Sequence, residues 1–146
     1  MSYTIVVRVI DTTHNNSNFT LAEKTVWHYA NGGRWCNTDS IQTLTMGGSG
    51  TSGGLRFMCG TGEEFLVVLG IHNYKRWCDI NTNLAPGDTG MKIHPEYYTD
   101  GSPQNKLLWD QLSEIEKTSA KGTKVNVKYV QEAADGKSFV VHITIS

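Results

Sequence analysis

The segment from residue 70 to residue 80 combines several kinds of polar side chain with two large aromatic rings. Its imidazole, amide, phenol, guanidinium, indole and carboxylate belong to His72, Asn73, Tyr74, Arg76, Trp77 and Asp79. A sugar ring presents hydroxyl groups that both donate and accept hydrogen bonds, and an apolar C–H face that can lie against an aromatic ring. The mixture therefore indicates a carbohydrate-binding site.

Each of these residues also has a purely structural interpretation. Tyr74 and Trp77, taken singly, are more readily explained as core residues whose polar tips are hydrogen-bonded. His72 is likewise more readily explained as a hydrogen-bonded structural histidine. The carbohydrate interpretation thus depends on the combination of groups and not on any one of them.

A glycine-rich segment, residues 47–54, contains five glycines and three hydroxyl-bearing side chains. Residues 48–53 match the GxGxxG pattern of dinucleotide-binding loops, which requires a strand before the loop and a helix after it. Because Leu55–Met58 continues as a strand, we predict a turn and no nucleotide site. Such a turn exposes N–H, C=O and hydroxyl groups, which suits a small polyhydroxylated ligand.

The sequence contains little that indicates catalysis. His72 and Cys78 are six residues apart, but nothing places them as a base and a nucleophile, and neither GxSxG nor HExxH occurs. Glu63 and Glu64 would point to opposite faces of a strand, which argues against a glycosidase pair with Asp79. We expect no enzymatic activity, no cofactor and no metal site.

Length, charge and cysteine usage limit the remaining possibilities. The 146 residues predict one domain, 1–146, and the formal net charge of -1 lacks the basic excess that nucleic-acid binding requires. The three cysteines have no CxxC spacing, which predicts reduced thiols. No secretory signal opens the sequence, and the longest apolar run, Phe65–Leu69, is too short to span a bilayer, so we expect a cytoplasmic protein.

The elements that must position the polar segments are mostly strands, because Thr, Val and Ile far outnumber Leu and Ala. Alternating apolar residues predict strands at Tyr3–Ile10, Thr25–Tyr29, Gln42–Thr45, Leu55–Met58, Glu64–Ile71, Lys124–Gln131 and Ser138–Ile145. The last two form the clearest hairpin, around Asp135-Gly136.

One segment has helical spacing instead. Ser102 before Pro103 resembles a helix start, and Leu108, Trp109, Leu112 and Ile115 recur at helical intervals. We predict one amphipathic helix over Gln104–Thr118 that packs its apolar stripe on the sheet. The lysines that follow from position 117 are expected to form a solvated face: Lys117, Lys121, Lys124 and Lys128.

Several of these motifs resemble the fungal fruit-body lectin family. The resemblance rests on Trp27–Gly33, Leu44–Gly53, His72–Ile80, Thr82–Leu84 and Glu96–Tyr98, and it extends from about Tyr3 to the carboxyl end. It implies a mainly β, actinoporin-like sandwich of two sheets joined by a helix-containing connection. It also implies a homotetramer that binds glycans and glycoproteins carrying Galβ1-3GalNAc, the Thomsen–Friedenreich antigen, and a defence role.

The resemblance implies two sugar sites on each protomer. The galactosyl site would be formed by Ala30, Ser49, Gly50, His72, Asn73, Tyr74 and Arg76. The planar amide of Asn73 carries both a donor and an acceptor, which suits recognition of an axial O4.

The second site, for terminal N-acetylglucosamine, would use Asp79, Ile80 and Thr82. The family also uses an arginine and a tyrosine there, and this sequence has Gln104 and Ile115 at the corresponding positions. The guanidinium of the arginine, which can form two parallel hydrogen bonds, and the hydroxyl of the tyrosine are both missing. We therefore expect a weak or altered second site.

Two other classes of function remain as alternatives. A membrane-active, pore-forming protein on the same scaffold would need an amphipathic amino-terminal helix, whereas this chain starts with the strand-like Tyr3–Val7. The other alternative is a purely structural interaction domain. The variant Asn73→Ala separates it from a lectin, because sugar binding equal to the parent's would argue against the proposed site.

Overall fold

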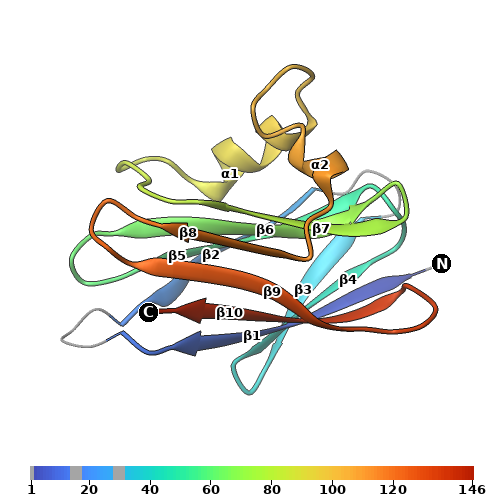
Figure 1. Cartoon of the computed structure of the whole chain (residues 1–146), viewed down its shortest axis with the longest axis horizontal. Helices are drawn as coiled ribbons and strands as arrows, with labels where there is room; N and C mark the ends of the chain where they lie inside the picture. Colours follow the sequence, from blue (N-terminus) through green and yellow to red (C-terminus); the bar gives the residue numbers. More distant parts are fainter. Residues whose placement is uncertain (1, 14–17, 28–31) are drawn as a thin grey trace.

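The protein consists of two β-sheets packed face to face, with short helices outside one of them (Figure 1). The computed structural model describes residues 2–13, 18–27 and 32–146. The expected mainly β sandwich with a helix-containing connection is confirmed.

The larger sheet has six strands in the order β3-β4-β1-β10-β9-β8. Its strands are β1 (Tyr3–Asp11), β3 (Gly33–Thr38), β4 (Ile41–Met46), β8 (Glu114–Thr118), β9 (Lys124–Glu132) and β10 (Ser138–Ile145). The neighbours pair antiparallel except β1 and β10, which run parallel with Ile5 opposite Phe139. The two terminal strands therefore lie side by side in the middle of this sheet.

The smaller sheet has four antiparallel strands in the order β2-β5-β6-β7. Its strands are β2 (Thr20–Trp27), β5 (Thr51–Met58), β6 (Glu64–His72) and β7 (Lys75–Asn81). Seven consecutive residues of β6 are buried, because one face of the strand meets the other sheet and the opposite face is covered by the helical connection.

The main core fills the space between the sheets. Inward residues of the larger sheet, such as Ile5 and Val141, pack with Leu55 and Val67 of the smaller one. Their outward neighbours along β1 are more exposed, which is the two-residue periodicity of a strand. Each fully buried aliphatic side chain contributes about 1.5–3 kcal/mol relative to leaving it in water.

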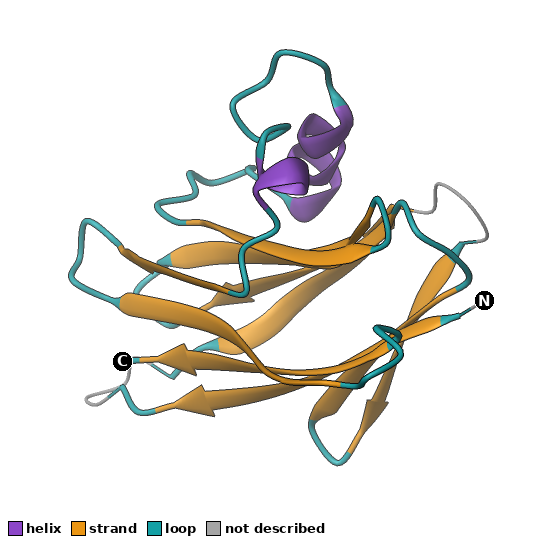
Figure 2. Ribbon diagram, turned by 45° about the vertical axis from the view of Figure 1, so that its right-hand side comes forward, coloured by secondary structure: helices purple, strands orange, loops and turns teal. Residues whose placement is uncertain are grey.

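The helical connection covers the outer face of the smaller sheet (Figure 2), and a second core lies beneath it. The connection contains α1 (Gly90–Ile93), the 3-10 helix η1 (His94–Tyr98) and α2 (Leu107–Asp110). Tyr97 and Leu108 pack there on Leu66, Val68 and Trp77. No helix in the described part of the chain is long and apolar enough to cross a membrane.

The single helix predicted over Gln104–Thr118 is wrong. The helical turn α2 ends at Gln111, whose backbone is left-handed with φ 50°, and the chain then enters β8. Ile115 belongs to that strand, opposite Val127, and packs on the main core. Leu108 and Ile115 therefore reach two different cores, and their helical spacing is coincidental.

The strand predictions were correct in position but incomplete. All seven predicted strands contain described strand residues, although positions 28 and 29 lie outside the described residues. The β9–β10 turn contains Gly136 at φ 70°, as the predicted hairpin requires. Three strands were missed: β3, β7 and β8.

Candidate functional site

The polar segment around residue 73 forms the turn between β6 and β7. His72 pairs with Lys75, so the loop between them is only Asn73 and Tyr74, and both have positive φ, 50° and 68°. This is the backbone of a two-residue type I′ turn, in which asparagine is favoured and tyrosine is unusual. The turn leaves Tyr74 74% exposed and places the side chain of Asn73 at the surface.

The glycine-rich turn lies against this hairpin turn. The Gly50 N–H donates to the carbonyl of Ile71 at 2.8 Å, and the Tyr74 N–H donates to the Ser49 hydroxyl at 2.9 Å. The structure therefore brings together five of the predicted galactosyl-site residues: Ser49, Gly50, His72, Asn73 and Tyr74.

The glycine-rich turn is shorter than predicted. β5 already begins at Thr51, so Gly53 and Gly54 belong to the strand. The hydroxyl-bearing residues Thr51 and Ser52 are fully buried. Only residues 47–50 can therefore present backbone and hydroxyl groups to a ligand.

A cavity of about 230 Å³ opens beside these two turns. It is lined by Gly50, His72, Tyr98, Asp100, Asn105, Leu108 and Trp109. Burial lowers the pKa of His72 below its ordinary value, so the imidazole is neutral at pH 7. Among the described residues, neither ring nitrogen has a hydrogen-bond partner. A neutral imidazole offers one donor and one acceptor, and here both belong to buried nitrogens that are left unpaired within the described part of the chain.

Among the described members of the predicted galactosyl site, only Gly50 and His72 line this cavity, and Tyr74 lines another one. Arg76 donates from Nε to Glu132 at 2.6 Å and from Nη1 to the carbonyl of Gln111 at 2.8 Å, and it lines a separate cavity. Its guanidinium links β7 to the end of α2. Ala30 lies outside the described residues.

The two aromatic residues of the segment have opposite environments. Trp77 is fully buried and packs on Tyr97 with a centroid distance of 5.2 Å, so it is a core residue, although its indole N–H has no hydrogen-bond partner among the described residues. The core interpretation is wrong for Tyr74, which is exposed. The aromatic ring beside His72 is instead Trp109, at 4.5 Å and nearly perpendicular. Sequence reasoning placed Trp109 in the apolar stripe of a helix, yet it is 59% exposed.

The predicted second site is centred on a buried carboxylate. Asp79 accepts a hydrogen bond from the Tyr97 hydroxyl at 2.6 Å and lies 3.4 Å from the ammonium of Lys117. The same ammonium donates to the carbonyl of Ile80 at 2.6 Å. Lys117 is exposed, as expected for a solvated face, but its ammonium is also bonded to two predicted site residues.

The other predicted members of the second site have different surroundings. Gln104 donates to Glu96 at 3.0 Å, whereas Ile115 packs on the main core. The hydroxyl of Thr82 accepts from the neighbouring Asn83 at 3.4 Å. Neither Gln104 nor Ile115 supplies a group to the carboxylate of Asp79.

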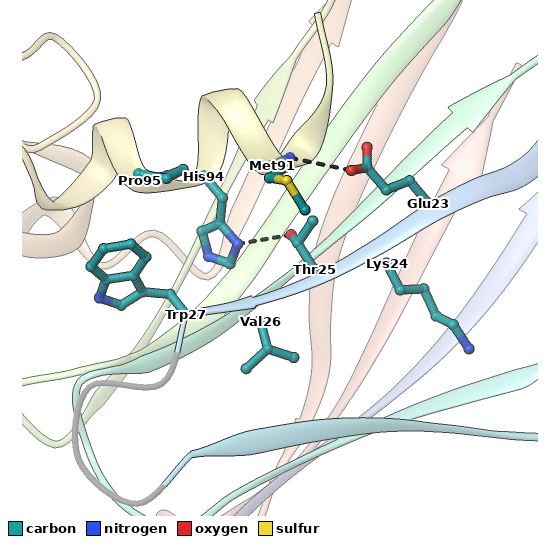
Figure 3. Close-up of a pocket in the computed structure, with 8 residues that line it drawn as sticks. All are labelled: Glu23, Lys24, Thr25, Val26, Trp27, Met91, His94 and Pro95. Atoms are coloured by element: carbon teal, nitrogen blue, oxygen red, sulfur yellow. Dashed lines mark hydrogen bonds between the residues drawn. The ribbon is translucent and has the colours of Figure 1, made fainter.

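A larger cleft, of about 570 Å³, lies between β2 and the helical connection (Figure 3). Its polar groups are already bonded within the protein: Glu23 accepts from the N–H groups of Gly90 and Met91, and Thr25 bonds to His94 at 2.8 Å. Val26, Met91 and Pro95 supply apolar lining. These bonds attach α1 and η1 to the sheet. They leave the cleft poorly suited to a hydroxyl-rich ligand.

The thiol of Cys78 is unsuited to nucleophilic chemistry. Burial, together with the neighbouring carboxylate of Asp79, raises its pKa to about 12. The thiol therefore stays protonated at neutral pH, whereas a nucleophilic cysteine needs a lowered pKa.

A two-sheet sandwich with a cavity beside two exposed turns, lined by polar groups and aromatic rings, is an arrangement suited to binding a carbohydrate. Residues 1–143 match the family model described as fungal fruit body lectin. The chain is 45% identical over 146 residues to Boletus edulis lectin from Boletus edulis, with complete coverage of both sequences. The chain therefore belongs to the fungal fruit body lectin family.

Solved structures show the same relationship. The crystal structure of wild-type Xerocomus chrysenteron lectin XCL matches with a TM-score of 0.93 and 45% identity, covering 100% of both chains. A mutated form of the same lectin also matches with a TM-score of 0.93, at 46% identity, over 100% of this chain and 99% of the other. The fold and the coarse function, carbohydrate binding, are thus those of a fungal lectin.

Proposed function

We propose that this lectin binds glycans ending in Galβ1-3GalNAc in the cavity beside His72 and does not alter them. The observation that carries the proposal is the contact of the two exposed turns next to an imidazole whose ring nitrogens have no partner among the described residues. The amide of Asn73 and the backbone of residues 47–50 supply further donors and acceptors, which a hydroxyl-rich ligand needs.

The test replaces Asn73 with glycine. Glycine tolerates the positive φ of this turn, so Asn73→Gly removes the amide without straining the backbone. We expect affinity for Galβ1-3GalNAc, measured by calorimetry, to fall about tenfold, because two hydrogen bonds of about 0.5–1.5 kcal/mol each are lost.

Asp39→Gly is the matched control. Asp39, at φ 50°, starts the comparable two-residue turn between β3 and β4, away from the cavity. It should leave the affinity unchanged. Parental affinity in Asn73→Gly would refute the site, and a parent that binds no galactosyl glycan would refute the function.

We propose further that terminal N-acetylglucosamine binds weakly at the second site. Gln104 and Ile115 replace the guanidinium and the phenol that the family uses. The Ile80 carbonyl already accepts a hydrogen bond from the Lys117 ammonium. Loss of two hydrogen bonds weakens this site about tenfold or more relative to one that keeps both groups, so we expect terminal N-acetylglucosamine to bind more weakly than Galβ1-3GalNAc. Titration of the parent with both sugars checks this, and equal affinities would contradict it.

Assembly as a homotetramer in the cytoplasm completes the proposal. Single sugar sites are weak, and linking several sites raises apparent affinity by about 10²–10⁴ through effective concentration. Light scattering measures the oligomeric state.

A pore-forming activity on this scaffold is the alternative, and leakage from glycan-free liposomes would favour it. A defence role would follow from binding glycans of an animal that ingests the tissue.

A further inference from the structure

The indole of Trp109 is a large apolar group left in contact with water at the rim of the cavity. It is 59% exposed, although its neighbour Leu108 is almost fully buried in the outer core. An exposed indole that also lines a cavity with polar groups is typical of a recognition surface.

The position of Trp109 relative to His72 is fixed on two sides. Leu108 holds α2 on the smaller sheet, and the side-chain amide of Gln111 donates to the carbonyl of His72 at 2.8 Å. Between these attachments the indole meets the imidazole at a centroid distance of 4.5 Å with an interplanar angle of 87°. The aromatic group is therefore held in place before any ligand binds.

The two rings offer complementary surfaces to one sugar. The imidazole supplies a donor and an acceptor, while the exposed indole supplies an apolar surface with a negative π face. A galactose ring has the same division, because its axial O4 leaves the C–H groups at C3, C4 and C5 together on the opposite face. Glucose, whose O4 is equatorial, lacks this continuous C–H face.

We propose that Trp109 is the aromatic wall of the galactosyl site and determines its preference for galactose over glucose configuration. The inference rests on the proposed function of the same cavity. In the bound state the C–H face of galactose lies on the indole while its hydroxyl groups bond to His72 and Asn73.

Binding measurements with two variants test this. Trp109→Ala should weaken Galβ1-3GalNAc binding about tenfold and reduce the preference over the glucose epimer, whereas Trp109→Phe should retain most of the affinity. Met91→Ala is the control, because Met91 is an even more exposed apolar residue of the helical connection that does not line this cavity. It should bind as the parent does.

Tryptophan fluorescence gives a second readout. Adding the disaccharide to the parent should shift the emission, and Trp109→Phe should bind the sugar without that shift. If Trp109→Ala binds with parental affinity and Trp109→Phe keeps the shift, the role of Trp109 is refuted while the proposed function stands. A parent that binds no galactosyl glycan would instead overturn the proposed function and this inference with it.

Discussion

Gly70→Ala is expected to destabilise the protein by about 3 kcal/mol, the usual upper range for overpacking a core. Gly70 lies in β6, opposite Ser52 on one side and Trp77 on the other. A methyl group there would come within 2.7 Å of the Thr51 carbonyl oxygen and 2.9 Å of the Ser52 Cα, and closer still to the Ser52 Cβ. Because most of these atoms are backbone, the paired strand itself must shift.

Urea unfolding measures this effect through the transition midpoint. Lys128→Ala, at an exposed position of β9, is the control and should change the free energy of unfolding by less than about 0.5 kcal/mol. A parental midpoint for Gly70→Ala would show that β5 and β6 do not approach as closely as described.

Stability is expected to fall as the pH drops from 6.5 to 4, because His94 is buried as the neutral imidazole. It is 2% exposed and bonds to the hydroxyl groups of Thr25 and Ser52. Burial lowers its pKa from 6.5 to about 4. In this interval the unfolded chain binds a proton that the folded protein does not, so acid favours unfolding, by about 3 kcal/mol once pH 4 is reached.

The measurement is the free energy of unfolding across that interval for the parent and His94→Gln. The variant should start less stable, because buried hydrogen bonds are lost, but its stability should depend less on pH. The pKa of His72 is also lowered by burial, so this residue contributes to the pH dependence of stability in both proteins. The variant His72→Gln separates that contribution. Equal slopes for the parent and His94→Gln would contradict the assignment.

The strands that could be predicted from the sequence are those with one apolar face. Ser138–Ile145 alternates buried and less buried residues along its length, and its bounds were predicted correctly. β7 was missed because four consecutive residues from Trp77 to Ile80 are buried, which hides the alternation. β8 was missed because Ile115 and Leu112 coincide with helical spacing, and only the tertiary structure decides between the two periods.

Half of the candidate site could be predicted in the same way. The composition of the segment containing Ser49 indicated an exposed turn and that of the segment containing Asn73 indicated sugar binding, and the structure places the two segments in contact. The roles of Trp109 and Lys117 could not be predicted, since both depend on where the chain turns after Gln111. Local periodicity carries no information about that change of direction.

The parallel pairing of β1 with β10 affects how the molecule is made. β1 leaves the ribosome long before β10, and Thr4 can meet Ser138 only after the more than 130 residues between them have been synthesised. Joining such distant segments closes a very long loop and slows folding. Until β10 is available, Ile5 and Val7 are exposed and can associate with other chains. The yield of folded protein in cells should therefore depend on chaperones more than its final stability suggests.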